Sequence, residues 1–452
     1  MERKLFGTDG IRGKANIYPM TAEIALKLGQ AIAKVLIKEN QDAPKVIIGK
    51  DTRVSGYIFE NALTAGLCSM GVSVYLVGPM PTPAIAHLTK SFAASAGIVI
   101  SASHNPADDN GIKIFTADGF KLPDDVEQKI EQIVLSNNIS TEHITVDKVG
   151  KAYRIEDARG RYIEFAKGTI NNLSLKGLKI ILDCANGAAY KVAPLILKEL
   201  GAEVIVLNNS PDGLNINSNS GAMHPEAVQK AVKENKADIG IALDGDADRL
   251  ILVDEKAVII NGDFILAMLA LEFSKKQKLK QNTVIATIMS NLGLINLLQK
   301  NNINVLQTKV GDRYVIEEMQ KSHSNLGGEQ SGHIILSDFS TTGDGTIAAL
   351  QILKIMKEQK KSLSQLASVM QEYPQIMINV PVKQKTPIEE LSLVKKKIKE
   401  IEKQLAQNGR VLVRYSGTEN CCRVMVEGES KQTITHYAQQ IAELIKKEIG
   451  LM

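Results

Sequence analysis

Apolar residues along this chain form short β-branched runs that alternate with stretches in which an apolar residue recurs every three or four positions. In the first such stretch, Ile24, Leu28, Ile32 and Val35 recur at helical spacing and predict an amphipathic helix. Strands are expected at 46–48, 72–77, 97–100 and 111–115, and further helices at 59–70, after Pro83 and from Asp124. Strands and helices that alternate with short connections predict a mainly parallel, doubly wound sheet.

The same alternation occurs twice more, starting near Gly160 and near Gly262. The second stretch predicts strands at 178–182, 203–207 and 238–243 and helices at 192–200 and 225–235. The third predicts helices at 264–273 and 294–300, strands at 283–288 and 304–307, and a glycine-rich loop at 327–333. Three units with the same order of elements indicate three similar mixed α/β/α domains.

The pattern changes after about Tyr373 and predicts a smaller α+β domain. It has expected strands at 376–382, 410–413 and 423–426, a lysine-rich helix at 387–407 and a closing helix that carries Ile434 and Ile441. We therefore expect four domains, at 1–156, 157–253, 254–370 and 371–452.

Composition excludes several classes of protein. Of 452 residues, 44% are hydrophobic and 23% charged, which is typical of a globular protein. A net charge of +4 and 4% aromatic residues do not suggest a nucleic-acid surface, and no apolar run reaches the length of a membrane span. Cys68, Cys184 and the adjacent Cys421 and Cys422 lack zinc-site spacing, so free thiols and a cytoplasmic location are expected.

The first candidate for chemistry is Ser103, at the end of the apolar run Ile98, Val99 and Ile100. Pro106 prevents the strand from continuing, so we expect Ser103 and His104 to be presented at the strand end and not buried. A serine beside an imidazole is a nucleophile, a phosphate carrier or a simple turn residue, and these alternatives stay open.

The second candidate is the alternation of Asp244, Asp246 and Asp248 where an expected strand ends. Three carboxylates in a small volume are tolerated around a cation, and Mg²⁺ suits a site with few carboxylates. Gly245 is expected to let the backbone turn tightly, and Arg249 is placed to meet a phosphate. A solvated acidic turn is the alternative; calcium is disfavoured because apolar residues follow where an EF-hand would supply ligands.

Two further loops carry polar side chains suited to sugars and phosphates. Glu329, Ser331 and His333 lie in a glycine-rich turn, where a carboxylate accepts hydrogen bonds from hydroxyls. Near the C-terminus, guanidinium groups and hydroxyls with a flexible glycine are the ingredients of a phosphate cradle, with a plain hairpin turn as the alternative. These residues are Arg414, Ser416, Gly417, Thr418 and Arg423.

The segments SASHNP, DGDADR, GGEQSGH and RYSGTEN resemble, in this order, the four active-site loops of the α-D-phosphohexomutase superfamily. With FGTDGIRG and GKDTRVSG, the chain is most similar to the bacterial phosphoglucosamine mutases within it. The resemblance implies four domains around a central cleft. It also implies a phosphorylated Ser103 that, with Asp244, Asp246 and Asp248, binds one Mg²⁺. Glu329 and Ser331 would hold sugar hydroxyls, and the C-terminal loop the phosphate that is not reacting.

The implied reaction is an intramolecular phosphoryl transfer between glucosamine 6-phosphate and glucosamine 1-phosphate through a 1,6-bisphosphate, on the way to UDP-N-acetylglucosamine and peptidoglycan precursors. Lys113 and Arg12 match positions credited with acid–base or charge-stabilising roles, and His104 could assist. A homodimer is the family expectation. The alternatives are a phosphomannomutase or phosphoglucomutase, a non-catalytic sugar-phosphate binder, or a phosphatase.

Three positions depart from the family pattern. Tyr415 and Asn420 stand where proline is more common in the fourth loop, which puts the rigidity of that loop in question. Ala247 replaces a common glycine in the metal loop and leaves the three carboxylates in place.

Overall fold

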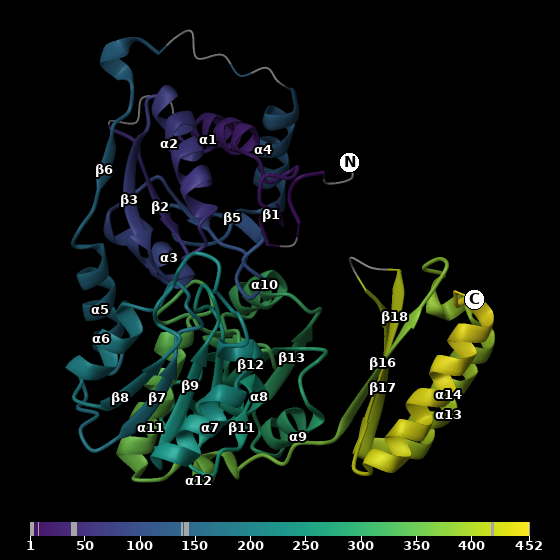
Figure 1. Cartoon of the computed structure of the whole chain (residues 1–452). Coiled ribbons are helices and arrows are strands. Elements are labelled where there is room, and N and C mark those ends of the chain that lie inside the picture. The colour runs from purple at the N-terminus through teal and green to yellow at the C-terminus, as the bar shows by residue number, and fades with distance from the viewer. Residues whose placement is uncertain are drawn as a thin grey trace. The chain divides into compact units, whose positions relative to one another are not determined.

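The computed structural model describes residues 4–7, 9–37, 43–136, 139, 144–416 and 420–451 (Figure 1). The chain divides into two compact units. The first comprises Met1–Ser290 and Leu298–Val369, and the second comprises Asn291–Leu297 and Met370–Met452. The first unit holds three sheets and the second holds one.

The first sheet has six strands in the order β1-β5-β4-β2-β3-β6. Its strands are β1 (Ile11–Lys14), β2 (Lys45–Lys50), β3 (Ser73–Pro79), β4 (Ala96–Ile100), β5 (Asp109–Thr116) and β6 (Ala152–Arg154). Strands β4, β2, β3 and β6 are parallel, whereas β5 and β1 run antiparallel to their neighbours, so the sheet is mixed. Its helices are α1 (Ala22–Leu36), α2 (Gly56–Ser69), α3 (Thr82–Ser91) and α4 (Asp124–Ser136).

Apolar side chains fix which helix covers which face of this sheet. Leu28 of α1, Leu63 of α2 and Ile130 of α4 belong to one buried cluster with strand residues such as Ile98. Helix α3 packs elsewhere on the sheet, where the missing side chain of Gly49 leaves room for Ile85. The expected helical face of α1 is therefore confirmed.

The second sheet has the order β11-β10-β9-β7-β8, and the third β13-β12-β14-β15. The second consists of β7 (Lys179–Asp183), β8 (Glu203–Leu207), β9 (Ile239–Leu243), β10 (Leu250–Asp254) and β11 (Ile259–Ile260), with helices α5 (Ala158–Gly168), α6 (Val192–Glu199) and α7 (Glu226–Asn235). The third consists of β12 (Thr283–Thr287), β13 (Asn304–Thr308), β14 (Leu326–Gly328) and β15 (Ile334–Leu336). Its helices are α8 (Gly262–Lys275), α10 (Asp312–Ser322), α11 (Gly345–Gln359) and α12 (Leu363–Ala367), whereas most of α9 (Leu292–Lys300) belongs to the second unit.

The second unit carries an antiparallel sheet in the order β16-β18-β17. Its elements are β16 (Gln375–Pro381), β17 (Gly409–Tyr415), β18 (Cys421–Gly428), α13 (Ser392–Leu405) and α14 (Lys431–Ile449). In Figure 1 both helices lie along the same side of the sheet. Ile434 and Ile441 of α14 are buried in its core, as expected from their spacing.

The predicted fold class, three mixed α/β/α domains followed by a small α+β domain, is confirmed. One detail is wrong: the loop expected at 327–333 starts inside β14, because Gly327 and Gly328 pair with β15. The four domain boundaries and the central cleft remain predictions; β11 pairs with β10 in the second sheet, just beyond the boundary predicted at 253. In the described part of the chain, no helix has both the length and the apolar character of a membrane span.

The contact between α1 and α2 depends on two glycines and yields a prediction. A Cβ on Gly66 would lie 2.2 Å from the Leu26 carbonyl oxygen, and a Cβ on Gly29 2.6 Å from the Leu63 carbonyl oxygen. Gly66→Ala should therefore push the helices apart and lower the free energy of unfolding by about 1–3 kcal/mol, measured by urea denaturation. Gly160→Ala in α5 is the matched control, because no atom lies within 4 Å of its added Cβ. A Gly66 variant as stable as the Gly160 variant would contradict this packing argument.

Candidate active site

Ser103 lies three residues after the end of β4, in a loop that the second sheet's loops cover. Only 2% of its surface is exposed, so the expectation that Ser103 is not buried is wrong. The reason is tertiary: Gly245 approaches so closely that a Cβ there would lie 2.5 Å from the Ser103 carbonyl oxygen. The Ser103 hydroxyl donates to Asp244 Oδ2 at 2.6 Å and lies 3.4 Å from His104 Nδ1.

Asp244, Asp246 and Asp248 occupy the turn between β9 and β10, and all three are buried. Each offers a carboxylate oxygen, and these three atoms lie within 4.8 Å of one another. Asp246 Oδ1 and Asp248 Oδ1 accept no hydrogen bond within the part of the chain that the structure describes. Buried carboxylate oxygens without donors are costly, and a divalent cation that prefers oxygen ligands would satisfy them. The residues present therefore fit Mg²⁺.

The glycine and alanine of this turn have different roles from those expected. Gly245 is needed for its close approach to Ser103, whereas the left-handed backbone falls on Ala247, with φ at +57°. An alanine with this φ is strained by about 1–2 kcal/mol, which explains why glycine suits the position. The buried turn holds Ala247 through a hydrogen bond from the Gly345 N–H to its carbonyl oxygen at 3.0 Å.

Lys113, on β5, is the main cation facing the three aspartates. Its Nζ donates to Asp246 Oδ2 at 2.8 Å and lies 3.5 Å from Asp248 Oδ2 and 3.2 Å from Asp9 Oδ2. Burial lowers the pKa of Lys113, but the charges of Asp246, Asp9 and Asp248 outweigh it and raise the pKa. Lys113 therefore stays charged near neutral pH and is a counter-ion to the buried carboxylates.

Arg12 reaches this group through Asp9, with which it forms an ion pair. Burial raises the pKa of the Asp9 carboxyl, but the charges of Lys113, Lys121 and Arg12 hold it well below the ordinary value. The structure therefore brings Arg12 and Lys113 to one ionised carboxylate, although they lie on different strands.

His104 lies beside the Ser103 hydroxyl, and Arg249 contacts Asp244, the partner of that hydroxyl. Burial, with the charges of Arg249 and Arg12, lowers the pKa of His104 to about 4, so its imidazole is neutral near pH 7. The Arg249 backbone N–H donates to Asp244 Oδ1 at 3.1 Å, which fixes the first aspartate.

Within the glycine-rich turn, the pair Glu329 and Ser331 has different surroundings from His333. The carboxylate of Glu329 accepts from the Gly311 N–H at 2.9 Å and from the Ser331 hydroxyl at 3.3 Å, and Ser331 is exposed. His333 is buried instead, with its ring nitrogens 3.7 Å from Asp248 and 3.6 Å from Asp312. Burial lowers the pKa of His333, but the nearby charge of Asp248, with those of Asp312 and Glu329, raises it overall. His333 thus supports the metal loop, apart from the pair suited to a sugar.

In the second unit, Arg414 on β17 and Arg423 on β18 are directly opposite each other. Arg423 Nη2 donates to the Ser416 hydroxyl at 3.4 Å, and burial and the charge of Arg423 lower the pKa of Arg414. Paired guanidinium groups suit an anion between them. Gly417 and Thr418 lie outside the described residues. The Tyr415 hydroxyl donates to the Thr386 carbonyl oxygen, so this residue, found where proline is common, tethers the strand before the loop.

Several site residues were not found from the sequence. They are Asp9, Asp51, Arg53, Thr82, Asn217, Asp312 and Lys385. Thr82 donates to Asp246 Oδ2 at 2.6 Å, and Lys385 Nζ donates to the Ser416 carbonyl oxygen at 2.8 Å. Asp51 and Arg53 belong to the quoted segment GKDTRVSG, but nothing local in that segment indicates a partner.

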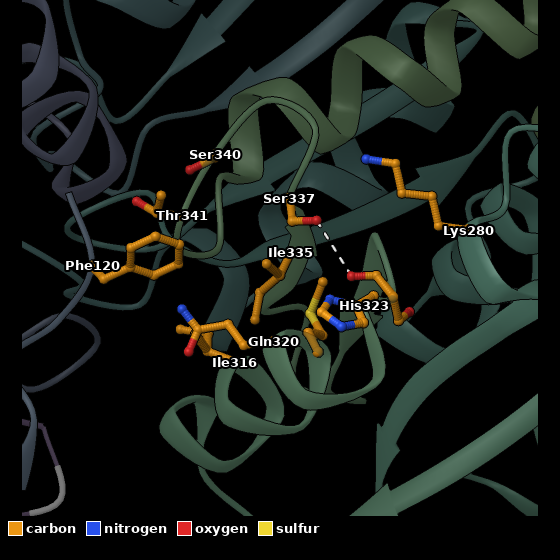
Figure 2. A pocket seen from close by; sticks show the side chains of 11 residues that line it. Phe120, Lys280, Ile316, Gln320, His323, Ile335, Ser337, Ser340 and Thr341 are labelled. Atoms are coloured by element: carbon orange, nitrogen blue, oxygen red, sulfur yellow. Dashed lines mark hydrogen bonds between the residues drawn. The ribbon is translucent and has the colours of Figure 1, made fainter. Parts of the chain in front are cut away.

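A separate pocket of about 400 Å³ lies beside α10 and β15 (Figure 2). Phe120, Ile316 and Ile335 supply apolar walls, and Gln320 and Thr341 are among its polar residues. None of the predicted site residues lines it. This pocket is therefore not part of the serine and aspartate centre.

Comparisons with known proteins agree along the whole chain. Residues 3–140, 160–257, 261–373 and 377–444 match, in turn, the phosphoglucomutase/phosphomannomutase alpha/beta/alpha domains I, II and III and the C-terminal domain. The chain is 54% identical to the phosphoglucosamine mutase of Syntrophotalea carbinolica over 452 residues, covering 100% of this chain and 99% of that protein. It is 55% identical to the phosphoglucosamine mutase of Geobacter metallireducens, covering 99% of each.

Solved structures share the fold at lower identity. A phosphoglucomutase/phosphomannomutase family protein from Burkholderia thailandensis has a TM-score of 0.79 at 23% identity, covering 98% of this chain and 99% of that chain. An N-acetylphosphoglucosamine mutase from Aspergillus fumigatus, in complex with GlcNAc-6P and magnesium, has a TM-score of 0.70 at 17% identity. It covers 99% of this chain and 96% of that chain.

The unsatisfied oxygens of Asp246 and Asp248 predict that Mg²⁺ stabilises the protein. Adding Mg²⁺ after treatment with a chelator should raise the unfolding temperature, because the ion binds the folded state. At a hundredfold excess over Kd, this binding raises the free energy of unfolding by about 2.7 kcal/mol. Sodium chloride at equal ionic strength is the control, and Asp244→Asn should reduce the gain. An equal rise with either salt would count against a specific site.

Proposed function

Because the chain belongs to the family of phosphoglucosamine mutases, in the α-D-phosphohexomutase superfamily, we propose that it interconverts glucosamine 6-phosphate and glucosamine 1-phosphate. The observation that carries the proposal is the 2.6 Å hydrogen bond between the Ser103 hydroxyl and Asp244, within a buried cluster of three carboxylates. Binding alone needs no phosphorylatable hydroxyl at that position.

In the proposed cycle, Ser103 starts as a phosphoserine. A free hydroxyl of the bound sugar phosphate attacks phosphorus, the bond from phosphorus to Ser103 Oγ breaks, and the sugar becomes a 1,6-bisphosphate. The attacking sugar hydroxyl loses its proton, and Ser103 Oγ gains one, so the step balances. The intermediate then reorients and returns its other phosphoryl group to Ser103. Phosphoryl transfer depends mainly on positioning and charge neutralisation, which this site supplies.

Charge neutralisation is proposed to come from three sources. Asp244, Asp246 and Asp248 would hold one Mg²⁺, which when bound offsets the roughly −1.5 to −2 charge of the phosphoserine. Lys113 remains protonated beside Asp246 and Asp248 and adds a fixed positive charge. Arg12 and Arg249 lie close enough to lower the pKa of His104 and supply further cations for phosphate oxygens.

The remaining loops are proposed to hold the substrate. Glu329 and Ser331 share a hydrogen bond. The Glu329 carboxylate would accept hydrogen bonds from sugar hydroxyls, and the Ser331 hydroxyl would donate one. Arg414, Ser416, Gly417, Thr418 and Arg423 would hold the phosphate that is not reacting. Two phosphate sites are what the cycle requires, because the bisphosphate presents each phosphate to Ser103 in turn.

The first test replaces the proposed phosphate carrier. Ser103→Ala should abolish both phosphoenzyme formation and turnover, because it removes the hydroxyl that meets Asp244. Intact mass after incubation with glucosamine 1,6-bisphosphate reports covalent phosphate, and a coupled assay reports turnover. Ser91→Ala, at an exposed position at the end of α3, is the control. Near-normal turnover in the Ser103 variant would eliminate the proposed cycle.

The second test addresses the substituent at carbon 2. A phosphomannomutase or phosphoglucomutase shares these loops, so kcat/KM should be measured for glucosamine, glucose and mannose 6-phosphates on one preparation. We expect the amino sugar to be preferred by at least about tenfold, which corresponds to about 1.4 kcal/mol of differential transition-state binding. Equal or higher values for glucose or mannose would favour the alternative activities.

A further inference from the structure

The backbone of Ser103 adopts a conformation that a serine rarely takes. Its φ of +50° lies in the left-handed region, which costs a residue with a side chain about 1–2 kcal/mol. A conformation of this kind persists only where the surroundings hold it. The question is therefore which groups hold the peptide on either side of Ser103.

On the amino side, the hydroxyl of Ser101 is the anchor. The Ser103 N–H donates to Ser101 Oγ at 2.9 Å, and Ser101 Oγ donates to Asp51 Oδ2 at 2.5 Å. Asp51 forms an ion pair with Arg53, and all of these side chains are buried. Ser101 thus connects the Ser103 peptide to a buried ion pair at the end of β2.

On the carboxyl side, the anchor comes from the second domain. Asn217 Nδ2 donates to the Ser103 carbonyl oxygen at 2.8 Å and to the Asn105 carbonyl oxygen at 2.9 Å. Arg53 Nη2 donates to the same Asn105 oxygen at 2.6 Å. Both hydrogens of the Asn217 amide are therefore used on the serine loop, which fixes the orientation of that amide.

The metal loop completes this arrangement. A Cβ on Gly245 would lie 2.5 Å from the Ser103 carbonyl oxygen and 2.8 Å from Asn217 Nδ2. The Ser103 peptide is thus enclosed between the metal loop and Asn217. Its hydroxyl meets Asp244, next to Gly245, at 2.6 Å.

We propose that Ser101 and Asn217 are positioning residues, which hold the left-handed Ser103 peptide from its two ends and so keep its hydroxyl at the aspartate cluster. The inference rests on the proposed function, because positioning matters through transfer to and from Ser103. Without either anchor, the loop relaxes toward a less strained φ and Oγ leaves its place. A misplacement of about 1 Å can cost about 100-fold in rate.

Asn217→Ala is the direct test. It should lower kcat by about tenfold to hundredfold while KM for glucosamine 6-phosphate stays within twofold, because the Asn217 amide donates to backbone carbonyls of the serine loop. Phosphorylation of Ser103 by glucosamine 1,6-bisphosphate, followed by intact mass, should slow by the same factor. Ser218→Ala, at the exposed neighbouring position, should behave as the wild type.

Two further variants separate positioning from folding. Asn217→Asp keeps the shape of the side chain but cannot donate, so it should lose at least as much kcat as Asn217→Ala. Ser101→Ala removes the other anchor, and it should likewise lower kcat while KM stays within twofold. Thermal unfolding curves give the folded fraction of each variant, and kcat is expressed per folded molecule.

The outcomes also separate this inference from the proposed function. Wild-type kcat per folded molecule in Asn217→Ala, or in Ser101→Ala, would overturn the inference. A rise in KM with unchanged kcat would do so as well, because it would place these residues in substrate binding. If the wild type itself gains no phosphate from the bisphosphate, the proposed function fails instead.

Discussion

The structure of this site depends on burying three carboxylates in one small volume. Asp244, Asp246 and Asp248 cannot all be charged there without cations, because like charges repel strongly where water is excluded. Burial and its two acidic neighbours raise the pKa of Asp244. Burial also acts to raise the pKa of Asp248, but Lys113 and His333 help to hold it well below the ordinary value. The neighbourhood of the cluster is therefore built largely from groups that balance its charge.

These balancing groups form a closed series of charged side chains, joined between Asp312 and Asp248 by the ring of His333, whose Nε2 accepts from the Gly343 N–H at 3.1 Å. Asp9 contacts Lys121 and Lys113; Lys121 contacts Asp312; His333 lies between Asp312 and Asp248; and Lys113 returns to Asp248. The residues of this series belong to loops and strands of three different sheets. Removing one charge would leave its partners buried and unpaired, which costs about 3–5 kcal/mol for a buried pair. The same charges that make the site suited to a phosphate therefore also connect the three α/β layers of the first unit.

Much of this protein was predictable from local patterns. The helical spacing of Ile24, Leu28 and Ile32 predicted α1, and the β-branched run at 98–100 predicted β4, because one face or both faces of each element must be buried. The alternation of Asp244, Asp246 and Asp248 predicted a carboxylate cluster, since residues so close in sequence have few ways to separate. Prediction failed where partners are far apart in sequence: Lys113 lies 133 residues from Asp246.

The amino-acid sequence by itself determined the order of the elements, the fold class and the presence of a serine and three aspartates at strand ends. Only the tertiary structure decided that Ser103 is buried, that Gly245 is needed for close approach and that Ala247 carries the left-handed backbone. It also decided that Asn217 holds the serine loop. The physical reason is that periodicity records which face of an element avoids water, whereas these contacts depend on loops that meet only after the sheets have packed.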